Sequence, residues 1–160
     1  MDGVKKECVK HAQIRGVLFH PERRGRYPAI IILSGSDGGK QEHAAALLAS
    51  KGYSAFALSY FGVEGVPKDL ENISLEYFQE ATMWLKDHPY VNGDVNLIGY
   101  SRGAELALLL GATFDDYKSI IAGAPSAYIT PGMKNGILLM CRRGCSIRKH
   151  CLMLSLNIAP

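Results

Sequence analysis

The sequence has no apolar run that is long enough to cross a membrane. Its longer apolar stretches are interrupted by charged residues, as Glu105 interrupts Ala104–Leu110, whereas a spanning helix needs ~20 consecutive apolar residues. The opening residues MDGVKK do not lead into the apolar region of a signal peptide. We therefore expect a soluble, cytoplasmic protein that has no membrane partner.

A broad excess of charge is also missing. The chain has 18 Lys and Arg against 15 Asp and Glu, and the excess lies near its end, because residues 137–160 contain four basic residues and no acid. Residues 1–136 are therefore nearly neutral. Because binding to nucleic-acid phosphates requires a basic face, we expect no nucleic-acid partner.

Cysteine is scarce outside the same end segment. Cys8 is alone in the first 136 residues, and Cys141, Cys145 and Cys151 follow, which is not the pattern of a secreted disulfide framework. A zinc site built from these three cysteines and His150 is disfavoured, because no C-x2-C pair is present and His150 is adjacent to Cys151. We expect no metal.

Nucleotide-binding signatures are missing as well. The Gly-rich run Ser34–Gly39 (SGSDGG) lacks the Gly-Lys-Ser/Thr ending of a P-loop and the spaced glycines of a dinucleotide-binding loop. We therefore expect no cofactor.

The sequence does contain a regular alternation of strand and helix patterns. Strands are predicted at residues 13–20, 29–33, 53–60, 95–99 and 117–122, and helices at residues 41–51, 74–87 and 102–111. This order predicts a doubly wound, mostly parallel α/β sheet. The alternating strand at 13–20 is expected at the outside of the sheet, whereas the continuous apolar run at 29–33 is expected inside it.

A G-x-S-x-G motif, Gly99-Tyr100-Ser101-Arg102-Gly103, lies between a predicted strand and a predicted helix. This setting is that of a nucleophile elbow, in which a tight turn exposes a serine hydroxyl above the end of the sheet. The turn requires small residues on both sides, which explains Gly99 and Gly103. Ser101 is the candidate nucleophile.

A serine nucleophile also needs backbone donors for the oxyanion. The N–H of Arg102, directly after the serine, is the first candidate. The loop Ser34–Gly39 follows an earlier central strand, and from it we expect the N–H of Ser36 to be the second donor.

Several segments together resemble a known family. They are the helix-to-strand segment AALLASKGY (45–53), the strand ALSYFG (57–62), the helix LEYFQEA (75–81) and the elbow GYSRGAELA (99–107). Over residues 13–130 they are similar to the C-terminal catalytic domain of the acyl-CoA thioesterase and bile acid-CoA:amino acid N-acyltransferase family. The resemblance implies an α/β-hydrolase fold related to dienelactone hydrolases, with Ser101 in the position of a nucleophile that is serine or cysteine in the family.

The remaining members of a catalytic triad are harder to find. On this fold the order is Ser, then Asp or Glu, then His, but the last acid of the chain is Asp116 and the only histidine after Ser101 is His150. Asp115 and Asp116 are expected to end a helix in solvent. His150 is the remaining candidate base, although it does not lie where the resemblance places the family's histidine.

The composition changes sharply near residue 136. We expect a partial α/β-hydrolase catalytic domain at residues 1–136, and at 137–160 an atypical, basic, Cys-rich tail that is disordered and that takes the place of the family's C-terminal part, as in a truncated or frame-shifted product. Ending the sheet at the 117–122 strand would expose an apolar edge. We therefore expect self-association through that edge.

Three functions follow from these observations. The first is a serine hydrolase of the acyl-CoA thioesterase type, with an acyl-CoA or another acyl thioester or ester as substrate and an acyl-enzyme intermediate. The second is a catalytically incomplete α/β-hydrolase fragment without the triad acid and base. The third is a carboxylester or dienelactone-type hydrolase.

Overall fold

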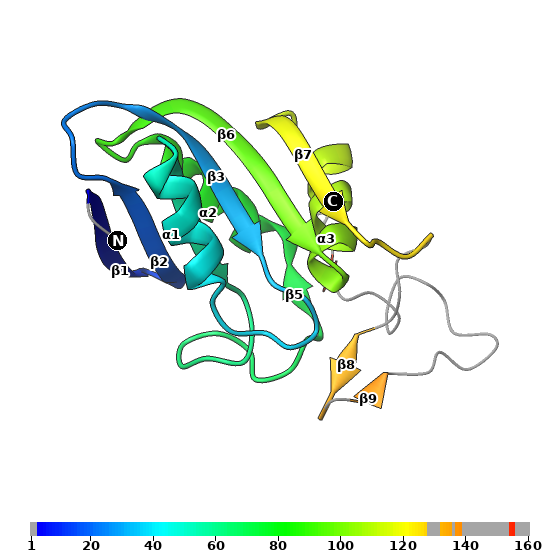
Figure 1. Ribbon diagram of the computed structural model, residues 1–160. Coiled ribbons are helices and arrows are strands. Elements are labelled where there is room, and N and C mark those ends of the chain that lie inside the picture. Colours follow the sequence, from blue (N-terminus) through cyan, green and yellow to red (C-terminus); the bar gives the residue numbers. More distant parts are fainter. Residues whose placement is uncertain (1–2, 128–131, 136, 139–153, 156–160) are drawn as a thin grey trace.

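The structure is a computed structural model that describes residues 3–127, 132–135, 137–138 and 154–155. Its largest feature is a six-stranded sheet in the order β1-β2-β4-β3-β6-β7 (Figure 1). Along the chain the elements are β1 (Val4–His11), β2 (Ile14–Pro21), β3 (Tyr27–Leu33), α1 (Glu42–Ser50), β4 (Ser54–Ser59), β5 (Ile73–Ser74), α2 (Leu75–Lys86), β6 (Val91–Tyr100), α3 (Arg102–Thr113), β7 (Tyr117–Gly123), β8 (Met133–Lys134), β9 (Ile137–Leu138) and β10 (Leu154–Ser155).

The predicted mostly parallel sheet is confirmed. Strands β4, β3, β6 and β7 run parallel, whereas β2 runs antiparallel to both β1 and β4. The apolar run Ala29–Leu33 lies in β3, between β4 and β6, and each of its five residues is buried. A strand that is covered on both faces needs such a continuous apolar run.

Successive residues of the central strands point to opposite faces and build two cores. Ile31 and Phe56 belong to the larger core, which α2 and α3 cover, whereas Ile32 and Ala57 belong to the smaller core, which α1 covers. Figure 1 shows α1 in front of the sheet and α2 and α3 behind it. The expected double winding is therefore present.

The prediction that residues 13–20 form the outer strand is wrong. They form β2, and β1 pairs with β2 from Val4↔Pro21 to His11↔Ile14 to make the edge. In β1 only Val9 is buried, and its three lysines are exposed. Charged side chains protect an edge strand from pairing with other chains. Because of them β1 has no alternation of apolar and polar residues from which a strand could be predicted.

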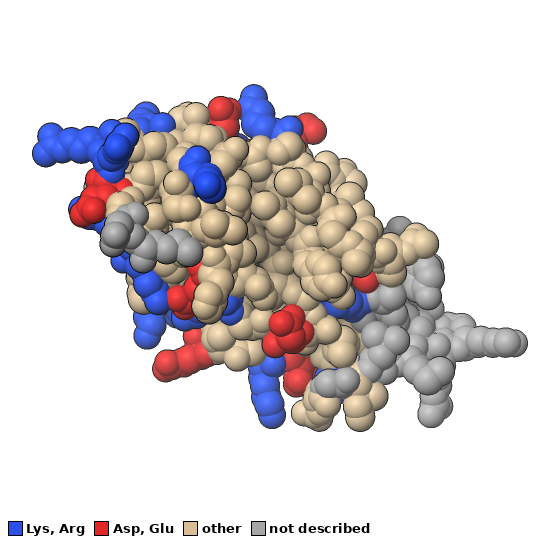
Figure 2. Space-filling model, viewed as in Figure 1, with Lys and Arg blue, Asp and Glu red and all other residues tan. Residues whose placement is uncertain are grey.

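The opposite edge of the sheet is different in character. Among the described residues no strand pairs with the outer side of β7. On the face that carries α1, Tyr100 at the end of β6 is 66% exposed and Ile121 in β7 is 59% exposed. Figure 2 shows a surface with few charged side chains over this part of the sheet.

The short strands form two separate pairs. β10 runs parallel to β5, and β8 runs antiparallel to β9. None of the helices in the described ranges has the length and apolar character of a membrane span.

Candidate active site

Ser101 lies at the turn between β6 and α3. Its backbone has φ 53° and ψ −118°, a positive-φ conformation that non-glycine residues rarely adopt. The turn is held by hydrogen bonds on both sides: the N–H of Ser101 donates to the carbonyl of Gly123 at 2.8 Å, and its own carbonyl accepts from the N–H of Ala104 at 2.9 Å. A strained serine that the surrounding backbone fixes in this way is typical of a nucleophile elbow.

The two glycines of the motif meet the steric demand that the sequence predicts. A Cβ on Gly99 would lie 2.0 Å from the carbonyl oxygen of Gly103. A Cβ on Gly103 would lie 2.4 Å from the carbonyl oxygens of both Leu33 and Ser34. The first turn of α3 can therefore approach the ends of both β6 and β3 only because these two positions carry no side chain.

The loop Ser34–Gly39 follows β3 and lies beside Ser101. A Cβ on Gly35 would be 3.5 Å from the Cβ of Ser101, so the two backbones are in close contact. The loop turns back on itself through a hydrogen bond of 3.1 Å from the N–H of Gly38 to the carbonyl of Gly35. The structure thus brings together the two segments from which the sequence analysis drew its oxyanion donors.

A buried tyrosine anchors the start of this loop. The hydroxyl of Tyr60 donates to the carbonyl of Ser34 at 2.5 Å, and Tyr60 is 1% exposed. Burial raises the pKa of Tyr60 far above its ordinary value, which keeps the hydroxyl protonated as a donor. This contact is not evident from the sequence, because nothing in the pattern of β4 shows which way the tyrosine after it points.

A cavity of about 490 Å³ opens between the loop and the elbow. Ser101, Ser36 and Asp37 form part of its polar wall, and Ile32 and Ile98 form part of its apolar wall. A small acyl group next to a serine and a loop rich in backbone donors would find both kinds of contact here.

The side chain of Arg102 takes part in a buried polar cluster. Its Nη1 donates to Oε2 of Glu105 at 2.9 Å, and both residues are less than 10% exposed. The second carboxylate oxygen of Glu105 accepts from the hydroxyl of Ser126 at 2.7 Å. The sequence analysis used only the backbone of Arg102, although the i, i+3 spacing of Arg102 and Glu105 would have suggested an ion pair.

The proposed base cannot be placed, because His150 lies outside the described residues. Among the described residues that line the cavity there is no histidine. His20 and His88 instead surround Tyr90, which directly precedes β6, whereas Ser101 follows the other end of that strand. These two histidines are therefore remote from the elbow.

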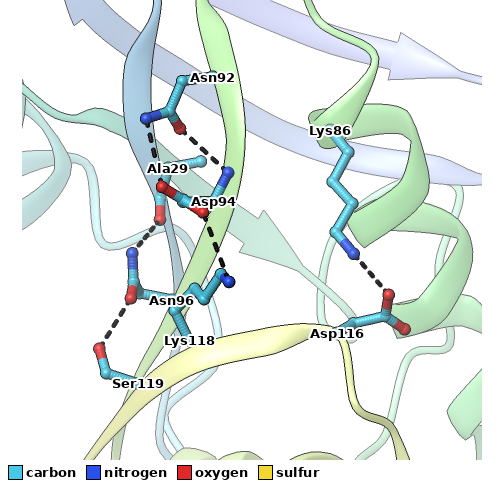
Figure 3. Close-up of polar contacts among 8 residues, drawn as sticks. All are labelled: Ala29, Lys86, Asn92, Asp94, Asn96, Asp116, Lys118 and Ser119. Atoms are coloured by element: carbon cyan, nitrogen blue, oxygen red, sulfur yellow. Dashed lines mark hydrogen bonds and ion pairs between the residues drawn. The ribbon is translucent and has the colours of Figure 1, made fainter.

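Asp116 corrects another expectation. It was expected in solvent, but its carboxylate accepts from Nζ of Lys86 at 2.5 Å, and its side chain is 22% exposed. Figure 3 shows this pair beside a second set of contacts, in which Asn96 bonds both the carbonyl of Ala29 and the hydroxyl of Ser119. Asp116 thus ties the loop before β7 to the end of α2, because Lys86 is the last residue of that helix.

The fold and the serine turn define the class of protein. A doubly wound sheet in this strand order, with a G-x-S-x-G turn after a central parallel strand, is an α/β hydrolase. Two solved structures share the fold: a putative dienelactone hydrolase from Klebsiella pneumoniae (TM-score 0.67, 14% identity, 79% of this chain and 62% of that chain), and the α/β hydrolase GrgF from a Penicillium species (TM-score 0.63, 22% identity, 76% of this chain and 46% of that chain).

Sequence comparison shows which family the chain resembles. Residues 73–136 match the family described as BAAT / Acyl-CoA thioester hydrolase C terminal. Human acyl-coenzyme A thioesterase 1 is 43% identical over 111 residues, which are 69% of this chain and 26% of the relative. Mouse acyl-coenzyme A thioesterase 6 is 44% identical over 115 residues, 71% of this chain and 27% of the relative. The predicted resemblance to the C-terminal domain of this family is therefore confirmed, and the chain spans about a quarter of the length of these relatives.

Proposed function

We propose that this chain is a serine hydrolase that acts on acyl thioesters of the acyl-CoA type. The observation that carries the proposal is the placement of Ser101, which is held at positive φ beside the Ser34–Gly39 loop and opens into the cavity that both line. The similarity to acyl-coenzyme A thioesterases supports a thioester substrate.

In the proposed reaction the oxygen of Ser101 attacks the thioester carbonyl. The N–H groups of Arg102 and Ser36 donate to the oxyanion that forms. The carbon–sulfur bond then breaks, the coenzyme A sulfur leaves as the thiol after it takes up a proton, and the acyl group stays on Ser101. Water hydrolyses the acyl-enzyme to a free acid and restores the serine. A general base must accept the serine proton, and His150 remains the candidate for this role.

A second candidate is an incomplete hydrolase that retains the elbow but turns over poorly. The observation in its favour is that no described residue lining the cavity is a histidine. Loss of the base of a serine triad costs several orders of magnitude in rate, and only the contribution of the oxyanion donors and of binding remains. The third candidate, a carboxylester or dienelactone-type hydrolase, has the same nucleophile and differs in the leaving group.

Active-site labelling followed by turnover separates these candidates. We expect an alkyl fluorophosphonate to label Ser101 of the full chain, and Ser101→Ala to abolish labelling. Ser36→Ala, which keeps the backbone N–H, should still be labelled. Faster hydrolysis of an acyl-CoA than of the matching p-nitrophenyl ester supports the thioesterase, and the reverse order supports the ester hydrolase. Slow labelling without turnover of either substrate supports the incomplete enzyme. No labelling of the wild-type chain would contradict the first and third candidates and support the incomplete enzyme.

We also infer that a second copy of the chain is a partner. The outer side of β7 has no strand beside it among the described residues, and the exposed Tyr100 and Ile121 lie on one face next to that edge. Two such edges can pair about a two-fold axis.

A further inference from the structure

The first turn of α3 contains a buried ion pair that the proposed reaction does not itself require. The side chains of Arg102 and Glu105 are 7% and 5% exposed, and Nη1 and Oε2 are 2.9 Å apart. Burying two charges is costly, and the mutual attraction offsets the cost only when further hydrogen bonds satisfy the pair. Such a pair beside a nucleophile therefore points to a role other than stability.

Glu105 connects this turn to the segment after β7. Its Oε1 accepts from the hydroxyl of Ser126 at 2.7 Å. Gly123, the last residue of β7, leads into this segment, and its carbonyl accepts a hydrogen bond from the N–H of Ser101 at 2.8 Å. The segment Gly123–Ser126 is thus bonded to the elbow at two points, one on the nucleophile and one on the carboxylate of Glu105.

The segment between these two points needs to be held. Ala124 has φ 52°, a conformation that costs a non-glycine residue free energy and persists only where neighbouring contacts impose it. The hydrogen bonds on both sides of Ala124 are contacts of this kind. Losing the bond from Ser126 to Glu105 would let the segment relax away from Ser101.

The turn that carries this cluster also lies against the anchored start of the other loop, because a Cβ on Gly103 would be 2.4 Å from the carbonyl oxygen of Ser34. Burial is the main cause that raises the pKa of Tyr60, and the charges of Arg102 and Glu105 also act on this hydroxyl, in opposite directions. Tyr60 in turn bonds Ser34 at the start of the Ser34–Gly39 loop. The ion pair therefore belongs to the same helical turn that packs against the start of the Ser34–Gly39 loop.

We propose that Glu105 is a positioning residue of the active site. It holds the side chain of Arg102 with one oxygen and Ser126 with the other, so that the peptide N–H of Arg102 and the segment after β7 are fixed around Ser101 before a substrate arrives. Donors that are already oriented need no reorganisation when the oxyanion forms. This proposal rests on the proposed function, since it assumes that Ser101 is the nucleophile.

The test compares variants of Ser126 and Glu105 in the full chain. Saturation kinetics of Ser101 with an alkyl fluorophosphonate give the maximal rate of labelling, kinact, and the concentration for half-maximal rate, KI. Loss of one hydrogen bond is worth about 1 kcal/mol, or roughly fivefold in rate. We expect Ser126→Ala to lower kinact by about that factor at unchanged KI, and Glu105→Gln, which removes the charge opposite Arg102, to lower it by roughly tenfold or more.

Two further variants separate positioning from a general effect on folding. Ser126→Thr keeps a hydroxyl at this exposed position, and its kinact should therefore equal that of the wild type. Ser119→Ala removes a comparable hydrogen bond, the 2.8 Å contact to Asn96 within the same sheet, and should leave kinact unchanged. Equal kinact in the wild type, Ser126→Ala and Glu105→Gln would overturn the proposal, as would an equal loss in Ser119→Ala.

Hydrogen exchange supplies a readout that does not depend on labelling. We expect Ser126→Ala to speed amide exchange in the segment Gly123–Ser126 and at Ser101, and Ser119→Ala to leave both unchanged. If the wild-type chain is not labelled at all, the proposed function fails, and exchange alone then tests the connection: faster exchange in Ser126→Ala supports it, and unchanged exchange overturns it.

Discussion

At Ser101 the backbone stores strain where the chemistry is proposed. A non-glycine residue in a sparsely populated conformation costs of order 1–3 kcal/mol, and the hydrogen bonds to Gly123 and Ala104 hold it there. The strain points the serine out of the helix that follows and towards the Ser34–Gly39 loop. This strain lowers the stability of the folded chain, and in return the serine lines the cavity beside that loop.

Gly103 allows a test of how tightly this turn is packed. In an ordinary exposed helix, Gly→Ala stabilises by about 1 kcal/mol, but here the new methyl group would lie 2.4 Å from two carbonyl oxygens. We expect Gly103→Ala to lower the free energy of unfolding by about 1–3 kcal/mol or more and to reduce labelling of Ser101. Urea denaturation measures the first effect.

The matched control for this substitution is Gly25→Ala. The new methyl group there would meet only the ring of Tyr27, at 3.1 Å or more, and that ring can move. A stability change of the same size in both variants, or no loss in Gly103→Ala, would show that the turn is looser than the structure has it.

At the scale of elements, the sequence analysis predicted most of the sheet and its helices, and the reasons for its errors are physical. The continuous apolar run of β3 is a local signal, and so is a serine at the start of the predicted 74–87 helix; in the structure the run is buried and Ser74 caps α2. β1 was missed because its exposed, charged residues carry no hydrophobic pattern. The contacts of Tyr60 with Ser34 and of Glu105 with Ser126 were missed because each joins residues from different elements, and only the folded chain brings those together.

The end of α2 packs against the hairpin of β1 and β2 through a histidine. The side chain of His88 is 10% exposed, its Nε2 is 3.4 Å from Oε2 of Glu7, and its ring also lies near those of His20, Trp84 and Tyr90. Burial lowers the pKa of His88, while the charge of Glu7 opposes this shift and His20 adds to it. The neutral ring is therefore the form that the folded chain prefers.

This shift predicts a pH dependence of stability. The unfolded histidine titrates near 6.5, and because its folded pKa is lower, the unfolded chain binds more protons as the pH falls below that value. We expect the free energy of unfolding to be level above about pH 7 and to fall below about 6.5. His88→Gln should reduce this slope, whereas His43→Gln, at an exposed position on α1, should not. Urea denaturation across this pH range measures the slope of the unfolding free energy against pH. Equal slopes in the wild type, His88→Gln and His43→Gln would contradict the assignment of the pH dependence to His88.

At the scale of the whole molecule, the two edges of the sheet are unequal. β1 carries lysines along its length, whereas β7 leaves Ile121 exposed beside the exposed Tyr100 of β6. An apolar edge with unpaired backbone groups favours pairing with another chain. This difference predicts that a second copy of the chain would pair with β7 and not with β1.

Ile121 is the residue with which to test this association. We expect the wild-type chain to elute from size-exclusion chromatography as a concentration-dependent oligomer under reducing conditions, and Ile121→Lys to shift it towards the monomer. Leu47→Lys, at a 53% exposed position on α1, is the control and should leave the oligomer intact. A wild-type chain that is monomeric at all concentrations would refute the pairing.

The position of β3 inside the sheet also bears on how the chain is made. β3 ends at Leu33, but its two neighbours, β4 and β6, begin only at Ser54 and Val91. During synthesis from the N-terminus at roughly 5–20 residues per second, the apolar run of β3 therefore leaves the ribosome several seconds before both of its partners exist. For that interval the nascent chain displays a segment of high β-propensity with no charge in it, and we expect this segment to be prone to pairing with other chains until β4 and β6 have been made.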